Sequence, residues 1–407
     1  MGVDLRMKLF EDKLRTDPSP LRHGESGYKF LDRVDDPFWE TVRTKLNEWF
    51  SQLPADEQAG LYGRFRQKYR KHADAAFWEL FLHEMFRRLG FSIEHHPDVP
   101  YTDNHPDFLM SKDNCEFYLE AVIVGDPEEE ALFEHEVSRI EAAINKVRNH
   151  NFWVFLEVDR DGEPLPSLKP LTKKISDWLN TLDPDHANAS MESAPNHDKL
   201  TALPHKSITV GDWQLKFTAI PRSEAARVAG RGRTFGGGPI RTRWVDDHVA
   251  IASNLEHKAS KYGLLDKPFV IALMSVRATT HGEHYLRALF GPAYDYPTMM
   301  SEKKIQPHFS NIGLWIDHDG TRREIVSAVL GATMVQPWSF PRQRITVRHN
   351  PWADHPLCLV LPFANVSFDT QNGHWLERDE SSTIAEVFDV APDWPGMEPF
   401  ERVDDLA

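Results

Sequence analysis

The stretch that decides the fold reads Ala75-Ala76-Phe77-Trp78-Glu79-Leu80-Phe81-Leu82-His83-Glu84-Met85-Phe86-Arg87-Arg88-Leu89-Gly90 and continues through residue 124. Its first part has apolar residues at helical spacing and stops at Gly90, a residue that often ends a helix in the left-handed conformation. Three segments rich in β-branched and aromatic residues follow, at 91–94, 105–110 and 116–124, with a polar turn at 111–114. The predicted order is therefore helix, strand, strand, strand.

Three acidic side chains lie within this order. Glu79 is inside the helix, Asp107 begins a strand, and Glu120 is in the middle of the next strand. A carboxylate inside an apolar strand is costly unless it is paired or binds a cation. Because side chains alternate along a strand, Glu120 shares one face with Tyr118 and Val122, and it can converge with Asp107 from the adjacent strand. Oxygen ligands of this kind suit Mg²⁺, which also keeps several waters.

This stretch resembles the PD-(D/E)xK nuclease superfamily, the restriction-endonuclease-like fold of many restriction and repair enzymes. The resemblance rests on Pro106-Asp107, on Glu120-Ala121-Val122 and on Glu79 before a Leu-Gly turn, and it covers about a quarter of the chain. It implies an α/β fold with a mixed sheet flanked by helices. It also implies a DNA endonuclease of a prokaryotic restriction or defence type, dependent on Mg²⁺ or Mn²⁺. Asp107 and Glu120 would hold the metal, and Glu79 would assist through the metal or a water.

The sequence departs from the family pattern at Val122. The family has a lysine there, two residues after the second acid, which orients and activates the attacking water. Either another group does this here or the site no longer cleaves. Lys112 is at an odd offset from Asp107, which turns it to the other strand face, and Lys146 lies far along the next helix. Lys258 is remote in sequence, but its helix can pack near the site, so we take it as the candidate catalytic lysine.

The main alternative is a catalytically inactive nuclease fold that binds nucleic acid or a partner protein. Val122 favours this alternative, whereas the retention of all three acids favours an enzyme. His83 and His105 are candidates for a base or a ligand near the carboxylates, although such histidines are more often structural. No His-x-x-x-His pair suggests a zinc hydrolase, and no Gly-x-Ser-x-Gly motif suggests a serine hydrolase.

Two basic segments are candidates for contact with a phosphate backbone. Residues 64–71 contain five bases interleaved with aromatic residues, among them Arg66 and Lys68. Residues 221–243 contain six arginines against Glu224 alone, and their predicted contacts come from Arg231, Arg233, Arg241 and Arg243. The alternatives are a solvated helix face for the first segment and a flexible surface loop for the second.

Composition sets the remaining expectations. The chain has 407 residues, 41% of them hydrophobic, and a net charge of -15, which argues against a general polyanion binder. No apolar run is long enough to span a bilayer, so we expect no membrane association. The two cysteines, Cys115 and Cys358, predict neither a disulfide framework nor a zinc site, and a reduced cytoplasmic location follows by default. The sequence leaves open a homodimer or a partner protein.

We predict four parts along the chain. Residues 1–72 form a helical segment that begins with a loose arm at 1–27. Residues 73–160 form the nuclease-like core, in which the helix at 126–149 and the strand at 152–158 complete the sheet. Residues 161–370 form an α/β extension that carries the Arg/Gly-rich loop. Residues 371–407 form an acidic tail with a net charge of -8 that is expected to be partly disordered.

Overall fold

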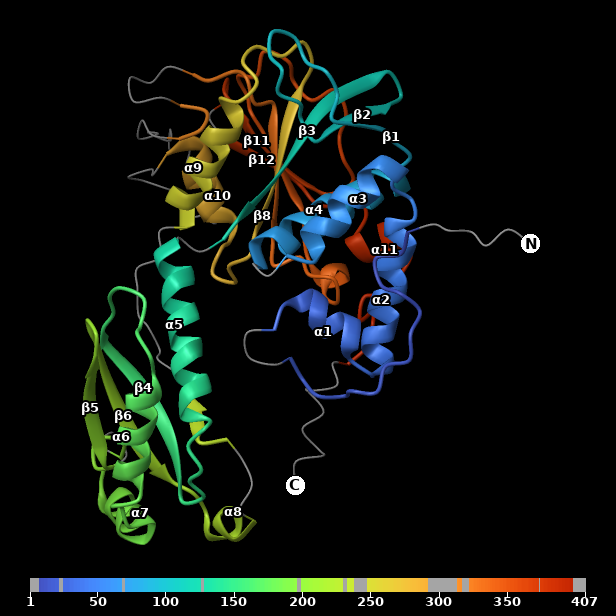
Figure 1. The fold of residues 1–407 in the computed structure, drawn as a ribbon. Coiled ribbons are helices and arrows are strands. Elements are labelled where there is room, and N and C mark those ends of the chain that lie inside the picture. The colour runs from blue at the N-terminus through green and yellow to red at the C-terminus, as the bar shows by residue number, and fades with distance from the viewer. Residues whose placement is uncertain are drawn as a thin grey trace. The chain divides into compact units, whose positions relative to one another are not determined.

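The computed structural model describes residues 7–21, 25–67, 70–125, 128–195, 199–229, 233–237, 247–291, 313–316, 322–372 and 374–397. The chain splits into two compact units, one made of residues 1–125 and 246–407 and the other of residues 126–245 (Figure 1). The second unit is thus an insertion into the first. This division differs from the predicted one, because the chain after residue 246 returns to the sheet that residues 92–124 begin.

The first unit is built on an eight-stranded mixed sheet in the order β1-β2-β3-β8-β9-β10-β11-β12. Its strands are β1 (Ser92–His95), β2 (Phe108–Lys112), β3 (Cys115–Val124), β8 (Phe269–Ser275), β9 (Ala328–Thr333), β10 (Thr346–His349), β11 (Ala364–Asp369) and β12 (His374–Arg378). β3, β8 and β9 are parallel to one another, and β1, β2 and β3 are successively antiparallel. The described fold is therefore mixed α/β.

Helices cover both faces of this sheet. The helices of the first unit are α1 (Gly27–Arg33), α2 (Pro37–Phe50), α3 (Ala55–Phe65), α4 (Arg70–Arg88), α9 (Asp247–Ala259), α10 (Gly282–Phe290) and α11 (Ile384–Phe388), with a 3₁₀ turn at Phe340–Arg342. Figure 1 shows α4 on one side of β3 and β8, and α9 and α10 on the other. The buried residues agree, because α4 belongs to one hydrophobic cluster and both α9 and α10 belong to a second.

The predicted order of helix, strand, strand, strand is confirmed by α4, β1, β2 and β3. Gly90 follows α4 with a φ of +84°, so it adopts the left-handed conformation expected after a helix. The polar turn between β2 and β3 has left-handed residues at Asp113 and Asn114, whose φ angles are +51° and +62°. Such a turn suits the twist of a two-residue β-hairpin.

The partner of β3 in the parallel part of the sheet is β8, which comes after the inserted unit. Leu119 pairs with Val270 and Val122 with Leu273, and every residue of β8 is buried. The expectation that the strand at 152–158 completes this sheet is wrong. That strand, β4 (Phe152–Arg160), pairs with β6 and β7 in the second unit instead.

The second unit has its own four-stranded sheet, in the order β5-β6-β4-β7. Its elements are α5 (Glu128–Ile144), β4, α6 (Lys169–Leu179), α7 (Pro184–Ser193), β5 (His205–Val210), β6 (Trp213–Pro221), α8 (Glu224–Ala229) and β7 (Phe235–Gly237). Ile140 and Ile144 of α5 and Leu171 and Ile175 of α6 are buried in one cluster with the residues of the sheet. The unit therefore has a hydrophobic core separate from those of the first unit.

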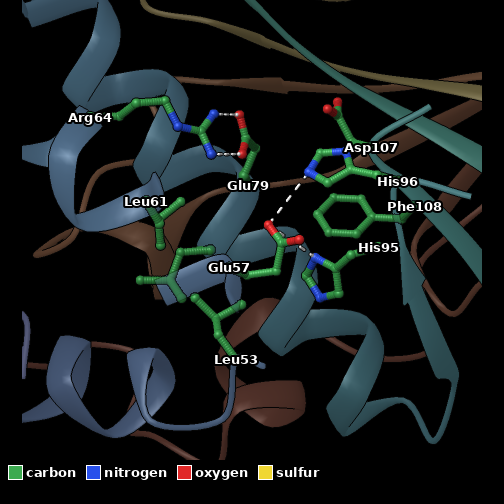
Figure 2. A pocket seen from close by; sticks show the side chains of 10 residues that line it. Leu53, Glu57, Leu61, Arg64, Glu79, His95, His96, Asp107 and Phe108 are labelled. Carbon is green, nitrogen blue, oxygen red and sulfur yellow. Dashed lines mark hydrogen bonds and ion pairs between the residues drawn. The ribbon is translucent and has the colours of Figure 1, made fainter. Parts of the chain in front are cut away.

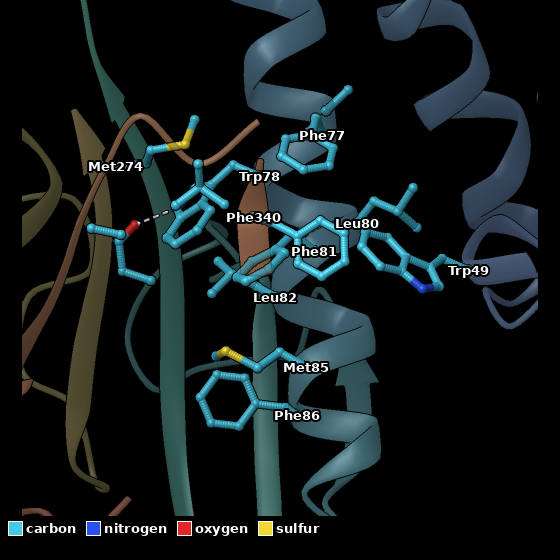
Figure 3. Packing of buried hydrophobic residues seen from close by; sticks show 14 of the residues in the cluster. Trp49, Phe77, Trp78, Leu80, Phe81, Leu82, Met85, Phe86, Met274 and Phe340 are labelled. Atoms are coloured by element: carbon cyan, nitrogen blue, oxygen red, sulfur yellow. Dashed lines mark hydrogen bonds between the residues drawn. The ribbon is translucent and has the colours of Figure 1, made fainter. Parts of the chain in front are cut away.

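Helix α4 is the central element of the first unit's largest core (Figure 3). Trp78 is fully buried, and its indole N–H donates to the carbonyl oxygen of Ala272 at 2.9 Å. Its ring stacks on Phe81 with the ring centroids 5.4 Å apart. Because Glu79 is the next residue along the chain, this packing also fixes the position of the helix backbone that carries the Glu79 side chain.

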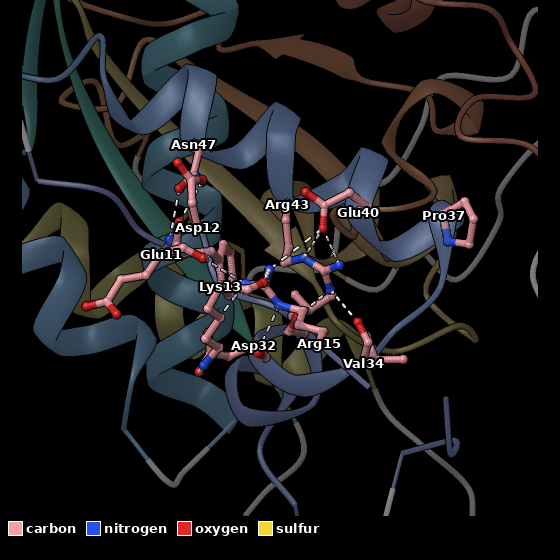
Figure 4. Close-up of polar contacts among 12 residues, drawn as sticks. Glu11, Asp12, Lys13, Arg15, Asp32, Val34, Pro37, Glu40, Arg43 and Asn47 are labelled. Atoms are coloured by element: carbon pink, nitrogen blue, oxygen red, sulfur yellow. Dashed lines mark hydrogen bonds and ion pairs between the residues drawn. The ribbon is translucent and has the colours of Figure 1, made fainter. Parts of the chain in front are cut away.

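The N-terminal arm is packed rather than loose over residues 7–21. Leu9 and Phe10 are buried, and Asn47 of α2 holds the backbone of Phe10 through two hydrogen bonds of 2.9 and 2.8 Å (Figure 4). Nearby, the buried Arg43 donates to the carbonyl oxygens of Leu31 and Val34 at 2.6 and 3.0 Å. These contacts fasten α1 and the arm to α2.

The acidic C-terminal segment is also part of the fold as far as residue 397, so the expectation of disorder does not hold there. β12 pairs with β11, and α11 has a Thr383–Glu386 capping box. Phe388 of α11 is buried against Trp49 and Phe81, with ring centroids 4.9 and 5.0 Å away. Part of the acidic segment is therefore packed against the hydrophobic core of the first unit.

The two cysteines, for which no disulfide framework was predicted, are joined by one disulfide bond. Cys115 at the start of β3 pairs with Cys358, 243 residues later, with their Cα atoms 5.8 Å apart. A single disulfide between cysteines so far apart in the chain leaves no local sequence pattern that would predict it. Among the described residues, no helix has the length and hydropathy that crossing a membrane requires.

Candidate functional site

Asp107 and Glu120 meet where β2 begins beside the middle of β3. The register pairs Phe108 with Leu119, which brings the preceding Asp107 next to Glu120. The backbone N–H of Asp107 donates to Glu120 Oε2 at 3.3 Å, and the N–H of Ala121 donates to Asp107 Oδ2 at 2.7 Å. Each carboxylate thus accepts a hydrogen bond from a backbone N–H of the neighbouring strand. The two acids lie close together, as predicted for adjacent strands.

Glu120 is fully buried in the middle of the sheet. Its Oε1 accepts a hydrogen bond from the Lys258 ammonium group and lies 3.6 Å from Lys261 Nζ. Its Oε2 accepts from the Tyr262 hydroxyl. Burial and the Glu120 charge raise the pKa of Tyr262 far above its ordinary value, so this phenol stays a donor. The buried carboxylate is therefore paired, as its burial requires.

Lys258 reaches Glu120 because α9 packs on β3. Ile251 and Leu255 of α9 are fully buried. Lys258 lies on the same helix face, because it comes seven residues after Ile251 and three residues after Leu255. Val122 belongs to the same hydrophobic cluster, so it contributes to the apolar surface under α9. A cation from a helix 138 residues after Glu120 in the chain thus lies beside that carboxylate.

The pKa of Asp107 is raised by its surroundings. Burial and the nearby carboxylates of Glu120 and Glu79 raise the pKa of Asp107 to about 8, against the lowering effects of the Ala121 N–H and of Lys258. Asp107 is therefore harder to ionise in the folded protein than an ordinary aspartate. A cation placed there would relieve the repulsion that raises this pKa.

Glu79 lies near Asp107 but has a partner of its own. Arg64 of α3 donates to both of its carboxylate oxygens in a two-pronged ion pair. Both side chains line a small cavity with Asp107 (Figure 2), and the cavity volume of about 20 Å³ is enough for roughly one water. The structure thus brings Glu79, Asp107, Glu120 and Lys258 to one place, with Glu79 neutralised by Arg64.

Two further side chains of this cavity, Glu57 and His96, are absent from the sequence-based set of site residues. His96 Nε2 lies 3.4 Å from Glu57 Oε2, and the His96 backbone is left-handed with a φ of +49°. The backbone N–H of His96 donates to the carbonyl oxygen of Asp107 at 3.1 Å. The only sequence signal for this pair is the His95-His96 dipeptide before the Pro-Asp motif.

The other lysine candidates lie elsewhere. Lys112 donates to the carbonyl oxygen of Leu89 at 2.7 Å, and Lys146 is an exposed residue of the second unit. His105 is outside the Glu79–Asp107 cavity, with its Nδ1 3.2 Å from the carbonyl oxygen of Pro97. Glu84, five residues after Glu79 on α4, pairs with Arg87 and Arg88 instead of facing the cavity.

The predicted nucleic-acid contacts are only partly within the described residues. Arg66 is exposed, donates to the Tyr62 hydroxyl at 2.9 Å, and lies over the rings of Tyr28 and Tyr62. Arg233 is also exposed. Residues outside the described ranges are Lys68, Arg231, Arg241 and Arg243.

The side chains around Asp107 and Glu120 can be compared with the ligands that the predicted metal ion needs. Within the part of the chain that the structure describes, no group of three or more His, Cys, Asp or Glu side chains is placed to hold a metal ion. Two carboxylates with waters remain a sufficient set for Mg²⁺, which commonly takes only one or two protein carboxylates. Asp107 Oδ1 has no hydrogen-bond donor among the described residues, so it is free to bind a cation.

His83, one turn after Glu79 on α4, is buried, and among the described residues its Nδ1 has no partner. Burial, assisted by the charges of His95 and Arg87, lowers its pKa from 6.5 to about 4. Between these two pH values the unfolded chain binds the proton and the folded chain does not, so stability should fall as the pH falls through this window. The loss is on the order of 2–3 kcal/mol.

The measurement is urea unfolding between pH 7 and pH 4 for the natural chain and for His83→Gln. The variant should lose clearly less stability over this range, because its side chain cannot take up the proton. Equal pH dependence in the two proteins would show that His83 is not the group responsible.

Comparison with known proteins assigns no family or function to this chain. The chain matches no protein-family model, no curated protein and no solved structure. Its function is therefore inferred from the residues around Asp107 and Glu120.

Proposed function

We propose that this chain is a metal-dependent DNA endonuclease, acting in prokaryotic restriction or defence. The observation that carries the proposal is the buried Glu120, which meets Asp107 across adjacent strands and accepts a hydrogen bond from Lys258. Two convergent acids and one lysine are the groups that the resemblance to PD-(D/E)xK nucleases calls for. In this proposal Lys258 of α9 takes the role of the lysine that Val122 replaces.

Asp107 and Glu120 would hold Mg²⁺ or Mn²⁺ in this proposal. A divalent ion bound there supplies Lewis acidity, which lowers the pKa of a coordinated water and offsets negative charge on the phosphate. Asp107 must be ionised to act as a ligand, since a protonated carboxyl binds metal ions poorly. Lys258 can then shift its hydrogen bond from Glu120 toward an anionic oxygen of the phosphodiester.

The reaction is hydrolysis of a phosphodiester bond. Water attacks phosphorus, one P–O bond breaks, and the proton lost by the water is balanced by protonation of the leaving oxygen. His96 lines the same cavity as Asp107 and is partly exposed, so it is placed to exchange a proton with solvent. Arg64 holds Glu79, which keeps that third carboxylate from adding an unpaired charge.

A second reading has an observation in its favour. Both oxygens of Glu120 already have donors within the chain, from Lys258, Tyr262 and the Asp107 backbone. A carboxylate that only stabilises the fold would look the same. In that case the chain is an inactive nuclease-fold module that binds nucleic acid or a partner protein, and a homodimer is also compatible. A cytoplasmic location remains a prediction in either case.

The test is cleavage of single- and double-stranded DNA and RNA by the purified chain over a range of Mg²⁺ and Mn²⁺. We expect DNA cleavage that EDTA stops and that Asp107→Ala abolishes. Ca²⁺ should support binding with little cleavage, because its looser coordination places the water poorly. The absence of any cleavage, or cleavage that persists in Asp107→Ala, would favour the inactive module.

A further inference from the structure

We propose that a groove in the second unit binds the phosphodiester backbone of the DNA substrate. The groove lies between α6 and the end of α5, and its volume is about 670 Å³. It is lined by the basic residues Lys146, Arg148, Lys169 and Lys173 and by the hydroxyl residues Thr172 and Ser176. The inference rests on the proposed function in taking DNA as the ligand.

The charge of the groove is unusual for this chain, whose net charge is -15. Four bases line it against one acid, Asp177, which pairs with Lys173 at 2.7 Å. Lys146, Arg148 and Lys169 are exposed and make no ion pair or side-chain hydrogen bond with any described residue. Several unpaired cations around one concave surface attract a polyanion and release its counterions when it binds.

Several other bases of the same unit have acidic partners. Arg139 pairs with Glu136 at 2.6 Å, Lys216 with Glu157 at 2.8 Å, and Arg227 with Asp185 at 2.7 Å. Lys174, Lys199 and Lys206 have no such partner among the described residues, but they do not line the groove. What distinguishes the groove is that three unpaired cations gather on one concave surface.

The secondary structure explains how the groove forms. Helix α6 buries Leu171 and Ile175 in the core of the unit. Lys169, Thr172, Lys173 and Ser176 follow the spacing of one helix face, at positions i, i+3, i+4 and i+7. The Thr172 hydroxyl lies 3.4 Å from the carbonyl oxygen of Ala143, which ties this face to the end of α5.

One described part of the arginine-rich segment lies against the end of the groove. The Thr234 hydroxyl donates to the carbonyl oxygen of Val147 at 2.6 Å, and the Phe235 N–H donates to Asn145 Oδ1 at 3.0 Å. These bonds hold the chain that directly follows Arg233 against residues 145–147. Arg233, which is exposed, is therefore a further base close to this end of the groove.

The experiment measures binding by the full-length chain, with Asp107→Asn present in every protein so that DNA is not cut. The groove variant combines Lys146→Ala, Lys169→Ala and Lys173→Ala. Its control combines Lys174→Ala, Lys199→Ala and Lys206→Ala, which removes the same charge from positions that do not line the groove. A fluorescently labelled duplex DNA is titrated with each protein over a series of salt concentrations.

We expect the groove variant to bind the duplex at least about tenfold more weakly at low salt. The slope of log affinity against log salt should be smaller by about 2–3, since each phosphate contact contributes about 0.9. The control should keep most of the slope. Asp177→Asn should bind more tightly than its parent, because it removes the one acid of the groove, and misfolding cannot explain such a gain.

The proposal would be overturned by unchanged affinity and slope in the groove variant, by equal losses in the groove and control variants, or by binding to RNA but not DNA. The separate cleavage test keeps the two proposals distinguishable. If the natural chain does not cleave but the groove variant alone loses binding, the nuclease assignment fails and the groove stands. If the natural chain cleaves and the groove variant binds normally, the groove assignment fails alone.

Discussion

Replacing Lys258 with methionine should lower the rate of DNA cleavage by about 10²–10³-fold, the usual cost of removing one preorganised donor from a developing negative charge. Methionine keeps the apolar stem but removes the ammonium group that donates to Glu120. Lys258→Arg should retain part of the activity, because it keeps the charge with altered geometry. The measurement is single-turnover cleavage in saturating Mg²⁺.

Lys112→Met is the matched control for this prediction. Lys112 is at the end of β2 farther from Asp107, and its ammonium group donates to the carbonyl oxygen of Leu89. Its replacement should leave the cleavage rate within a small factor of the natural rate. Thermal unfolding of both variants separates a catalytic loss from a folding loss. A folded Lys258→Met protein that cleaves at the natural rate would remove Lys258 from the mechanism.

Trp78→Ala should produce the largest loss of stability, about 3–5 kcal/mol, as for other buried aromatic residues cut to alanine. The indole is fully buried, stacks on Phe81 and donates to the carbonyl oxygen of Ala272. The change leaves a large cavity between α4 and β8 and removes the hydrogen bond to the Ala272 carbonyl oxygen. The measurement is the free energy of unfolding from urea titration.

Trp78→Phe gives a graded comparison for this prediction. It keeps most of the aromatic packing but loses the N–H donor, so its loss should be clearly smaller than that of Trp78→Ala. Trp153→Ala, a change at a tryptophan that is 43% exposed, should cost less than either. A loss at Trp78→Ala no greater than at Trp153→Ala would show that α4 is not the packed centre of the first unit.

Local sequence patterns predicted the elements around the site well. Helical spacing and Gly90 placed α4, and β-branched and aromatic runs placed β1, β2 and β3 with the turn between the last two. Strand alternation then placed Glu120 beside Asp107. These features depend on neighbours within a few residues, so a single sequence contains them.

Long-range pairing is where the sequence analysis failed. The pattern of residues 152–158 predicts a strand but does not say which sheet it joins, and it joins β6 rather than β3. The continuous apolar run of β8 is typical of a buried parallel strand, yet its partner β3 lies before the whole inserted unit in the chain. The Cys115–Cys358 bond is a similar case, with 243 residues between its ends.

Some residues of the candidate site could be predicted from the sequence and others could not, again because local spacing is visible in a sequence and long-range packing is not. Glu79, Asp107 and Glu120 stand within 42 residues, and their spacing is visible in the sequence. Lys258 was one of three lysines without a local reason to prefer it, and only the packing of α9 on β3 selects it. Arg64, Tyr262 and the Glu57–His96 pair depend on tertiary contacts that no spacing rule reveals.

Binding of Mn²⁺ in the absence of nucleic acid, measured by isothermal titration calorimetry, tests the proposed metal site most directly, because a contaminating nuclease cannot imitate it. The proteins to compare are the natural chain, Glu120→Gln and the control Glu116→Gln, which changes an exposed acid on the same strand. We predict that the natural chain and Glu116→Gln each bind a Mn²⁺ ion that Glu120→Gln does not. Equal binding by all three proteins, or no binding by the natural chain, would contradict the assignment of Asp107 and Glu120 as the metal ligands.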